Sequence, residues 1–270
     1  MKYFLLIIGL FCFDQSIIAQ TNTKKIVKIA ETGKPTIEYL YDKKGRLITV
    51  KENAQVEKTI HYDDAGRVKA IRFYQKKKIV HTDTNFVYTS TGKRVSFDRI
   101  FPGYSTDKFS FSYDNNDRIT KRRIDKYRVS KKEGAAIPWE ELTYSYNGNT
   151  VSMEKKETSF GGIIGYTYIY EFDNKGNILS LTEKTNVETD SPKHIITGYD
   201  DHPRISLPDE WIDRTFPQSA NNHSRYQWNE KRYETFAYTY NPDGSVNGYT
   251  YFYQGNDLSL TRKIKITYSK

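Results

Sequence analysis

Apolar and polar residues alternate with a period of two along most of this chain. Aromatic or large aliphatic side chains take every second position in five clear runs: Ile37–Tyr41, Phe109–Tyr113, Tyr166–Phe172, Phe236–Tyr240 and Tyr249–Tyr253. This period places alternate side chains on opposite faces of a β-strand, so each run predicts a strand with one aromatic face. The exception is Pro208–Arg214, where proline followed by two acidic residues predicts the start of a short helix.

A short polar turn follows each aromatic strand. The four clearest turns are Asp42–Gly45, Asp63–Gly66, Asp173–Gly176 and Asn241–Gly244. The leading Asp or Asn can cap its own turn, and Gly supplies the positive φ that closes a hairpin. Asp117 holds the glycine position of one copy and can also adopt a positive φ, whereas Pro203 cannot. We therefore expect the copy that begins at Tyr199 to depart from a regular hairpin.

The strand and its turn together form a repeated phrase, Tyr-Asp-x-x-Gly-Arg-apolar. It is clearest at Tyr41–Leu47 and Tyr62–Val68, and looser copies extend to Val246. Successive anchor aromatics lie 21 to 41 residues apart, and a step near 25 fits one hairpin per unit. About sixteen strands in one antiparallel series would twist and curl. The predicted fold class is all-β, with antiparallel hairpin repeats in one long twisted sheet curled into an open barrel, half-barrel or spiral shell.

The phrase resembles the YD repeat of the Rhs and teneurin families, and of small exported Bacteroidetes-type proteins known as YD-repeat or Rhs-like sugar-binding proteins. The match covers about 200 residues as degenerate copies, and those at Tyr41 and Tyr62 lie nearest the consensus. The resemblance implies a β-sheet shell that wraps a cargo or presents a surface. The repeats are too few for the cocoon of the large relatives and no self-cleaving core motif is recognisable, so we do not expect this chain to encapsulate a C-terminal toxin.

The N-terminal residues have the pattern of a secretory signal. Lys2 precedes the apolar run Tyr3–Phe13, which is too short to span a bilayer, and Ala19 suits a cleavage site. We therefore predict a signal peptide at 1–20 and export to the periplasm, the outer surface or the medium. A weaker alternative is lipid anchoring at Cys12, because a lipobox cysteine normally follows a small residue and here it follows phenylalanine.

Residues 21–270 are predicted to form a single domain with an irregular insertion near 199–232. On the signal-peptide interpretation this domain has no cysteine, which excludes disulfides and thiolate chemistry. The five histidines lack metal-ligand spacing, and no Gly-x-Ser-x-Gly or P-loop motif occurs. The sequence therefore predicts no catalytic residue, no metal, no cofactor and no transmembrane span.

Charge favours anionic partners. The formal net charge is +9, and the stretch Arg118–Lys132 is strongly basic. A polysaccharide or another envelope polymer is the favoured partner, and nucleic acid is not favoured. The alternative is that these basic side chains are solvated and only discourage edge-to-edge aggregation.

The insertion is the best candidate for a binding region, because long irregular loops often carry function. The predicted ligand-binding residues are Trp139, Trp211, Trp228, Arg122 and Arg123. Alternatively, the two tryptophans of the insertion plug the open end of the curled sheet.

Two functions remain open. The first is a non-enzymatic binding module at the cell envelope for a glycan or other anionic polymer. The second is a structural scaffold that docks a secreted or envelope protein. The sequence does not decide between them, nor does it give the oligomeric state.

Overall fold

The fold is taken from a computed structural model, which describes seven stretches of the chain: 24–128, 137–159, 162–185, 193–209, 219–229, 232–255 and 259–269. Eighteen strands and no helix occur in these stretches. The predicted signal peptide at 1–20 lies outside them. Of the predicted helix at Pro208–Arg214, only Pro208 and Asp209 are described, and they form a turn.

The strands are five to eleven residues long. The first nine are β1 (Ile26–Glu31), β2 (Ile37–Tyr41), β3 (Leu47–Glu52), β4 (Gln55–Tyr62), β5 (Val68–Gln75), β6 (Lys78–Tyr88), β7 (Arg94–Phe101), β8 (Ser105–Tyr113) and β9 (Ile119–Arg128). The other nine are β10 (Ile137–Asn147), β11 (Thr150–Ser159), β12 (Gly162–Phe172), β13 (Ile178–Thr185), β14 (Lys193–Pro203), β15 (Asn221–Asn229), β16 (Arg232–Tyr240), β17 (Val246–Gln254) and β18 (Ser259–Tyr268).

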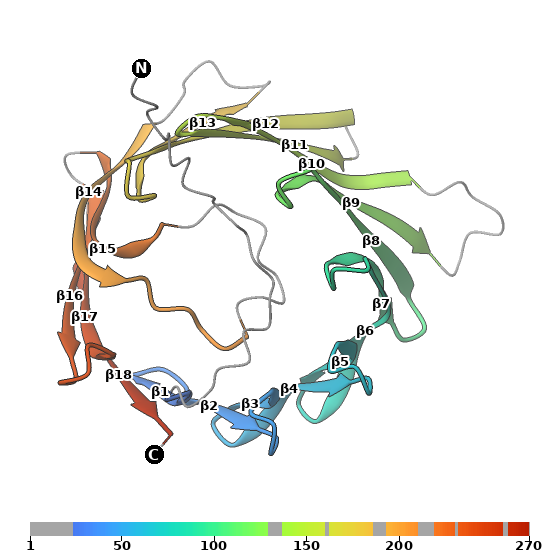
Figure 1. The fold of residues 1–270 in the computed structure, drawn as a ribbon, viewed down its shortest axis with the longest axis horizontal. Helices are drawn as coiled ribbons and strands as arrows, with labels where there is room; N and C mark the ends of the chain where they lie inside the picture. The colour runs from blue at the N-terminus through green and yellow to red at the C-terminus, as the bar shows by residue number, and fades with distance from the viewer. Residues whose placement is uncertain are drawn as a thin grey trace, which may run out of the picture.

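All eighteen strands belong to one antiparallel sheet. Each strand pairs with the strands before and after it in the chain, and β1 pairs with both β2 and β18. The sheet therefore curls round until its first and last strands are hydrogen-bonded, as the ring of ribbons shows (Figure 1). The predicted all-β class and the curled sheet of antiparallel hairpins are confirmed. No helix in the described stretches has the length and apolar character needed to cross a bilayer.

The turn residues behave as their chemistry predicts. Gly45, Gly66, Gly176 and Gly244 all have φ between 77° and 85°. Asp117, which replaces glycine in its copy, has φ of 65°. The copy that contains Pro203 is irregular, as expected, since the pairing of β14 with β15 shifts register three times.

Buried apolar side chains hold the sheet in three clusters. The first lies on β1 to β5, β17 and β18, and it includes Tyr39 and Ile264. The second lies on β10 to β13 around Met153, and the third on β7 to β9, where the rings of Phe97 and Phe109 stack at 4.4 Å. Full burial of such a side chain contributes about 1.5–3 kcal/mol, so these rows supply most of the stability of the sheet.

The two ends of the described chain together build one further unit. The N–H of Ser269 donates to the carbonyl of Lys25 at 2.7 Å, and the N–H of Lys25 donates to Ser269 Oγ at 3.1 Å. The same two bonds join Asp42 and Arg46 in the β2–β3 turn, at 2.9 and 2.8 Å. Strand β1 thus takes the place of the outgoing strand of a hairpin that begins with β18.

Candidate functional site

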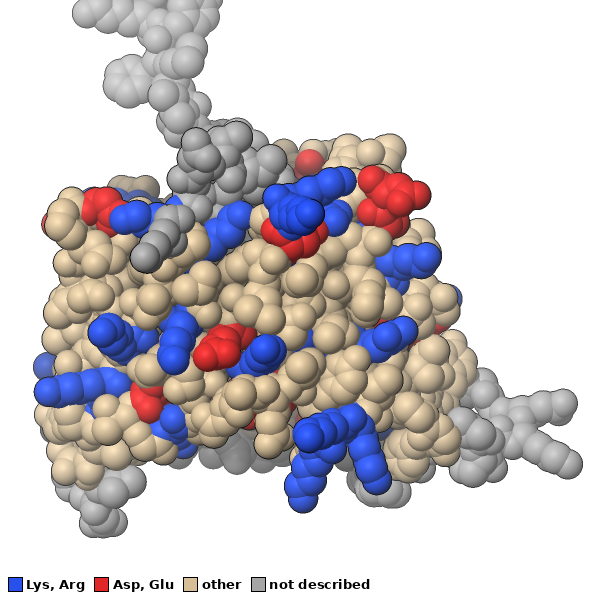
Figure 2. Space-filling model, turned by 90° about the horizontal axis from the view of Figure 1, so that it is seen from below, with Lys and Arg blue, Asp and Glu red and all other residues tan. Residues whose placement is uncertain are grey.

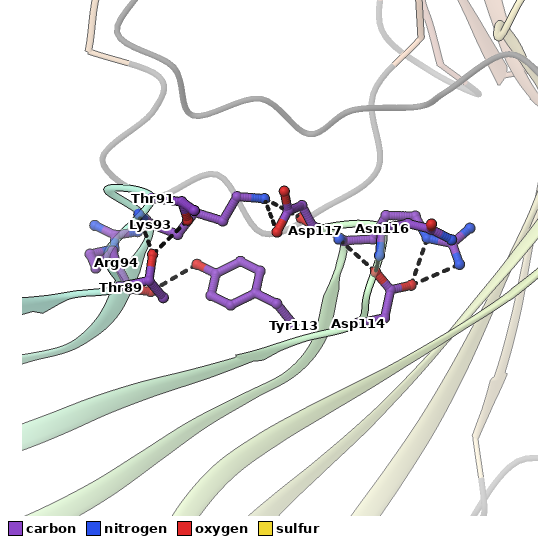
Figure 3. Close-up of polar contacts among 9 residues, drawn as sticks. Thr89, Thr91, Lys93, Arg94, Tyr113, Asp114, Asn116 and Asp117 are labelled. Atoms are coloured by element: carbon purple, nitrogen blue, oxygen red, sulfur yellow. Dashed lines mark hydrogen bonds and ion pairs between the residues drawn. The ribbon is translucent and has the colours of Figure 1, made fainter.

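In the regular turn, the leading aspartate is hydrogen-bonded by the residue four positions later, as the turn after β8 shows (Figure 3). Asp114 accepts hydrogen bonds from the backbone N–H and from Nε of Arg118, at 2.9 and 2.8 Å. Partial burial disfavours the charged carboxylate, but these hydrogen bonds outweigh it and hold the pKa of Asp114 below its usual value. The same arrangement holds Asp42 with Arg46 and Asp63 with Arg67.

The tyrosine that precedes each turn ties its unit to the preceding strand. In Figure 3, the hydroxyl of Tyr113 donates to the carbonyl of Arg94 at 2.8 Å. In the described stretches, seven tyrosines donate in this way to the first residue of the strand before: Tyr41, Tyr62, Tyr88, Tyr113, Tyr146, Tyr199 and Tyr268. Burial raises the pKa of Tyr62 and Tyr146 to about 12, so these hydroxyls stay protonated and donate.

The basic residue of the phrase stacks on the tyrosine of the next unit. The guanidinium of Arg46 lies 4.4 Å from the ring centroid of Tyr62, and that of Arg118 lies 4.2 Å from Tyr146. Lys93 lies over Tyr113 and also reaches Asp117 of the next turn at 3.0 Å. The repeated tyrosine, aspartate and basic side chains of these turns are therefore engaged with the sheet and with one another.

The unit that begins at Tyr199 uses its aspartate differently. Asp200 Oδ2 accepts hydrogen bonds from the hydroxyl of Tyr240 and from Nδ2 of Asn222, the latter at 3.4 Å. Arg204, four residues after Asp200, directs its N–H to the carbonyl of Ala220 instead. The carbonyl just before β15 thus accepts the N–H that, in a regular turn, donates to the turn's own aspartate.

Two histidines and an amide complete this cluster. The ring of His202 stacks on Tyr240 at 3.8 Å, and Nδ1 of His202 is buried without a hydrogen bond. Burial, with Arg204 nearby, lowers the pKa of His223, so this imidazole stays neutral. Asn222 is 1% exposed and joins the pieces, since it accepts from the N–H of Ile205 at 2.8 Å and donates to the carbonyl of Pro203 at 3.2 Å.

The segment after β14 runs inside the ring (Figure 1). Ile205 packs against the first core cluster. Asp209 Oδ2 then lies 2.6 Å from Nζ of Lys58 on β4. The inner face of the sheet is therefore the face that carries Lys58, and the pairing register extends this assignment to neighbouring strands.

A row of alternating charges follows on this inner face. Cross-strand partners on β6 to β9 are Asp83 with Arg99, Arg99 with Asp107, and Asp107 with Lys126. The row continues on β9 to β11 through further ion pairs of Arg122, Glu140, Lys155 and Glu157. We call these eight residues the charge ladder.

The charge ladder is partly buried and electrically balanced. Asp83 is 1% exposed and is held by Nε and Nη2 of Arg99 at 2.8 and 2.9 Å. Burial raises the pKa of Asp107, although Lys126 and Arg99 favour its charged form. Removing one member would leave its buried partner uncompensated, which is costly. The ladder ends beside Tyr166 and Tyr168 on β12, whose rings stack at 6.3 Å and are half-buried.

The residues predicted to bind a ligand lie in different places. Arg122 belongs to the charge ladder, whereas Arg123 is on the opposite face of β9 and pairs with Asp125 at 2.8 Å. The two arginines therefore do not face one ligand. Trp139 lies in β10 and Trp228 in β15, but their side chains are outside the described part of the structure, as is the whole of Trp211.

In its described part, residues 118–128, several side chains of the basic stretch pair with acidic neighbours. Arg118 pairs with Asp114, and Lys121 with Glu141 at 2.8 Å. The outer wall near β1 to β5 likewise shows basic side chains spread singly or in small groups among acidic ones (Figure 2). On this face the net positive charge is not gathered into one patch.

Sequence reasoning missed both the charge ladder and the cluster around Asn222. A signal for the ladder exists in the period of two, because Arg99 and Asp107 lie two residues from the core phenylalanines Phe97 and Phe109. A charge in phase with a buried aromatic predicts a charge on the inner face. No comparable signal marks Asn222, whose partners come from β14, from the segment that follows β14 and from β16.

Comparisons with known proteins give fold-level likeness alone. No family model matches the chain, and no curated protein matches it. Among solved structures, a porin-like protein from Bacteroides uniformis aligns with a TM-score of 0.45 and 13% identity, covering 90% of this chain and 96% of that one. A TcdB2-TccC3-TEV structure aligns with a TM-score of 0.37 and 13% identity, covering 86% of this chain and 14% of that one. At these values the likenesses carry no functional argument.

Proposed function

We propose that this protein is an exported, non-enzymatic binding module of the cell envelope that recognises a glycan or another anionic polymer. The inner wall supports this proposal, because the charge ladder leads directly to Tyr166 and Tyr168. Lys155 marks the junction, with its Nζ 5.5 Å from the ring centroid of Tyr166. Carboxylates accept hydrogen bonds from sugar hydroxyls, and cations pair with acidic groups. Tyrosine adds an apolar ring with a polar tip.

The finer family assignment is part of the same proposal. The repeated Tyr-Asp-x-x-Gly-Arg phrase and the curled hairpin sheet agree with a YD-repeat or Rhs-like exported protein. The N-terminal residues 1–20 would direct its export, with lipid anchoring at Cys12 as the weaker route. Trp139, Trp211 and Trp228 remain proposed ligand contacts, and Arg122 acts from within the charge ladder.

Pull-down with insoluble envelope polysaccharides tests the proposal. Wild-type protein should be retained, and added salt should weaken retention because charge contributes to it. Replacing Tyr166 and Tyr168 by Ala should reduce retention at least tenfold. Tyr104→Ala is the matched control, since Tyr104 is 63% exposed in the β7–β8 turn and belongs neither to the charge ladder nor to β12. Equal retention of both variants would contradict the proposal.

The second function, a scaffold that docks an envelope protein, is favoured by one observation. Ile100, Tyr104 and Tyr127 are 38%, 63% and 43% exposed at the same end of β7 to β9. Exposed apolar groups that lie together often mark a protein contact. The same pull-down decides between the two functions, because a scaffold would ignore every polysaccharide and Tyr104→Ala would then reduce recovery of a protein partner.

A further inference from the structure

The carboxylate of Asp209 fills a small receptor on the inner wall. Nζ of Lys58 lies 2.6 Å from Asp209 Oδ2, and the two side chains are only 24% and 16% exposed. The hydroxyls of Tyr39 and Tyr41 lie near enough to Asp209 for its charge to act on both, while Tyr41 donates its own hydrogen bond to the carbonyl of Ile26 at 2.7 Å. One ammonium therefore binds the carboxylate beside two half-buried or buried phenol rings, and charge-assisted bonds of this kind are strong.

Both tyrosines stay protonated at physiological pH, so neither adds a negative charge beside Lys58. Burial, reinforced by the charge of Asp209, raises the pKa of Tyr41 to about 12 and raises that of Tyr39 further. Tyr39 is 2% exposed and belongs to the first core cluster, so its hydroxyl is fixed in place. The receptor is therefore preorganised by the sheet and does not depend on the segment that fills it.

The described part of the segment that carries Asp209, residues 204–209, makes few hydrogen bonds. Its backbone N–H groups at Arg204 and Ile205 bond to Ala220 and Asn222. Beyond Ile205, its hydrogen bonds within the described stretches come from the side chains of Ser206 and Asp209 alone. Leu207 in the middle is 40% exposed. Among the described residues, the carboxylate itself is held by its ion pair with Lys58.

We propose that Lys58, with Tyr39 and Tyr41 beside it, is a carboxylate-binding site for a uronic-acid-containing polysaccharide, and that Asp209 occupies this site until the polymer displaces it. The inference deepens the proposed function and rests on it. A tethered carboxylate competes at an effective concentration on the order of millimolar. A polymer with closely spaced uronates can match that concentration, whereas a single free carboxylate cannot.

Binding of oligogalacturonate, measured by isothermal titration calorimetry, tests the site. Asp209→Asn should bind it at least tenfold more tightly than wild type, because the internal competitor has lost its charge. Lys58→Met should abolish this gain in the double variant. Asp243→Asn is the matched control, since Asp243 pairs with Lys24 at 2.7 Å on the surface. This control should bind like wild type.

Several outcomes would overturn the inference. Unchanged or weaker binding by Asp209→Asn removes the competitor role, and an equal gain for fully methyl-esterified oligogalacturonate shows that the carboxylate is not what is recognised. An equal gain for polyglutamate overturns the assignment to a polysaccharide. If Lys58→Met does not fold, as judged by circular dichroism, Lys58→Gln replaces it.

Failure here is distinguishable from failure of the proposed function. The carboxylate site alone is overturned if Asp209→Asn has no effect while retention on neutral polysaccharides still depends on Tyr166 and Tyr168. If neither wild type nor any variant binds any polymer, both the carboxylate site and the proposed function are overturned.

Discussion

The turn at Asp114 and the turn at Asp200 begin with the same two residues, tyrosine and aspartate, and end in different structures. Asp114 is bound by Arg118, four residues later in its own turn. Asp200 is bound by Tyr240 and Asn222, which come from other strands. Pro203 explains the difference, since it cannot take the positive φ that Asp117 adopts in the regular turn.

The two turns therefore differ in where their polar groups find hydrogen-bond partners. A regular turn satisfies its own polar groups locally, so it can be repeated around the sheet without regard to its neighbours. The broken turn leaves polar groups that distant residues must satisfy, and it releases the segment that reaches Asp209. The hydrogen-bonded cluster around Asn222 and the contact of Asp209 with Lys58 therefore both follow from the loss of one regular hairpin turn.

The largest expected effect lies in the broken turn. Asn222→Ala should lower the free energy of unfolding by about 2–4 kcal/mol, because it strands the buried N–H of Ile205 and the carbonyl of Pro203. Urea denaturation measures the change. Asn116→Ala is the control, since Asn116 is exposed in the regular turn and should shift stability by less than about 0.5 kcal/mol. Equal effects of the two substitutions would contradict the comparison.

The regular turns should give a smaller and pH-dependent effect. Asp114→Asn should cost about 1 kcal/mol at neutral pH, because water can replace part of what the exposed turn loses. The folded pKa of Asp114 lies below its usual value of 3.8, so its contribution is complete above that value and is lost as pH falls through the lowered pKa.

Denaturation from about pH 6 to about pH 3 measures this dependence. Asp114→Asn should show a shallower loss of stability on acidification than wild type. Asp42 and Asp173, whose pKa values are lowered by similar hydrogen bonds despite some burial, should behave like Asp114. A variant curve parallel to that of wild type would show that the charged form of Asp114 is not favoured by folding.

The smallest expected effect concerns the tyrosine ties. Phe172 occupies the tyrosine position before its turn and has no hydroxyl to donate. Phe172→Tyr should add a hydrogen bond to a carbonyl at the start of β11 and raise the free energy of unfolding by about 0.5–1 kcal/mol. Tyr62→Phe, which removes the 2.9 Å bond to Leu47, should lower it by about 1 kcal/mol. Thermal unfolding of both variants checks the pair, and changes of the same sign would contradict the role of the hydroxyl.

Local chemistry made the fold predictable. The period of two located the aromatic strands, and Asp with Gly located the turns, because both signals act within a few residues. The prediction of about sixteen strands fell short of the eighteen described. One reason is β1, whose place beside β18 depends on pairing between the two ends of the chain.

The candidate site was much less predictable. The contact of Lys58 with Asp209 joins residues 151 apart, and no local pattern encodes that separation. The sequence grouped Arg122 with Arg123 because they are adjacent, yet adjacent residues of a strand point to opposite faces. The strand register instead pairs Arg122 on β9 with Glu140 on the neighbouring strand β10.

The sequence by itself determined the hairpin unit, the aromatic face and the place where the repeat breaks, because each rests on backbone preference and period. Only the tertiary structure decided which charges meet on the inner wall and which carboxylate lies against Lys58. The physical reason is that ion pairs and buried hydrogen bonds form between side chains brought together by strand register and sheet curvature. Those two properties belong to the whole sheet.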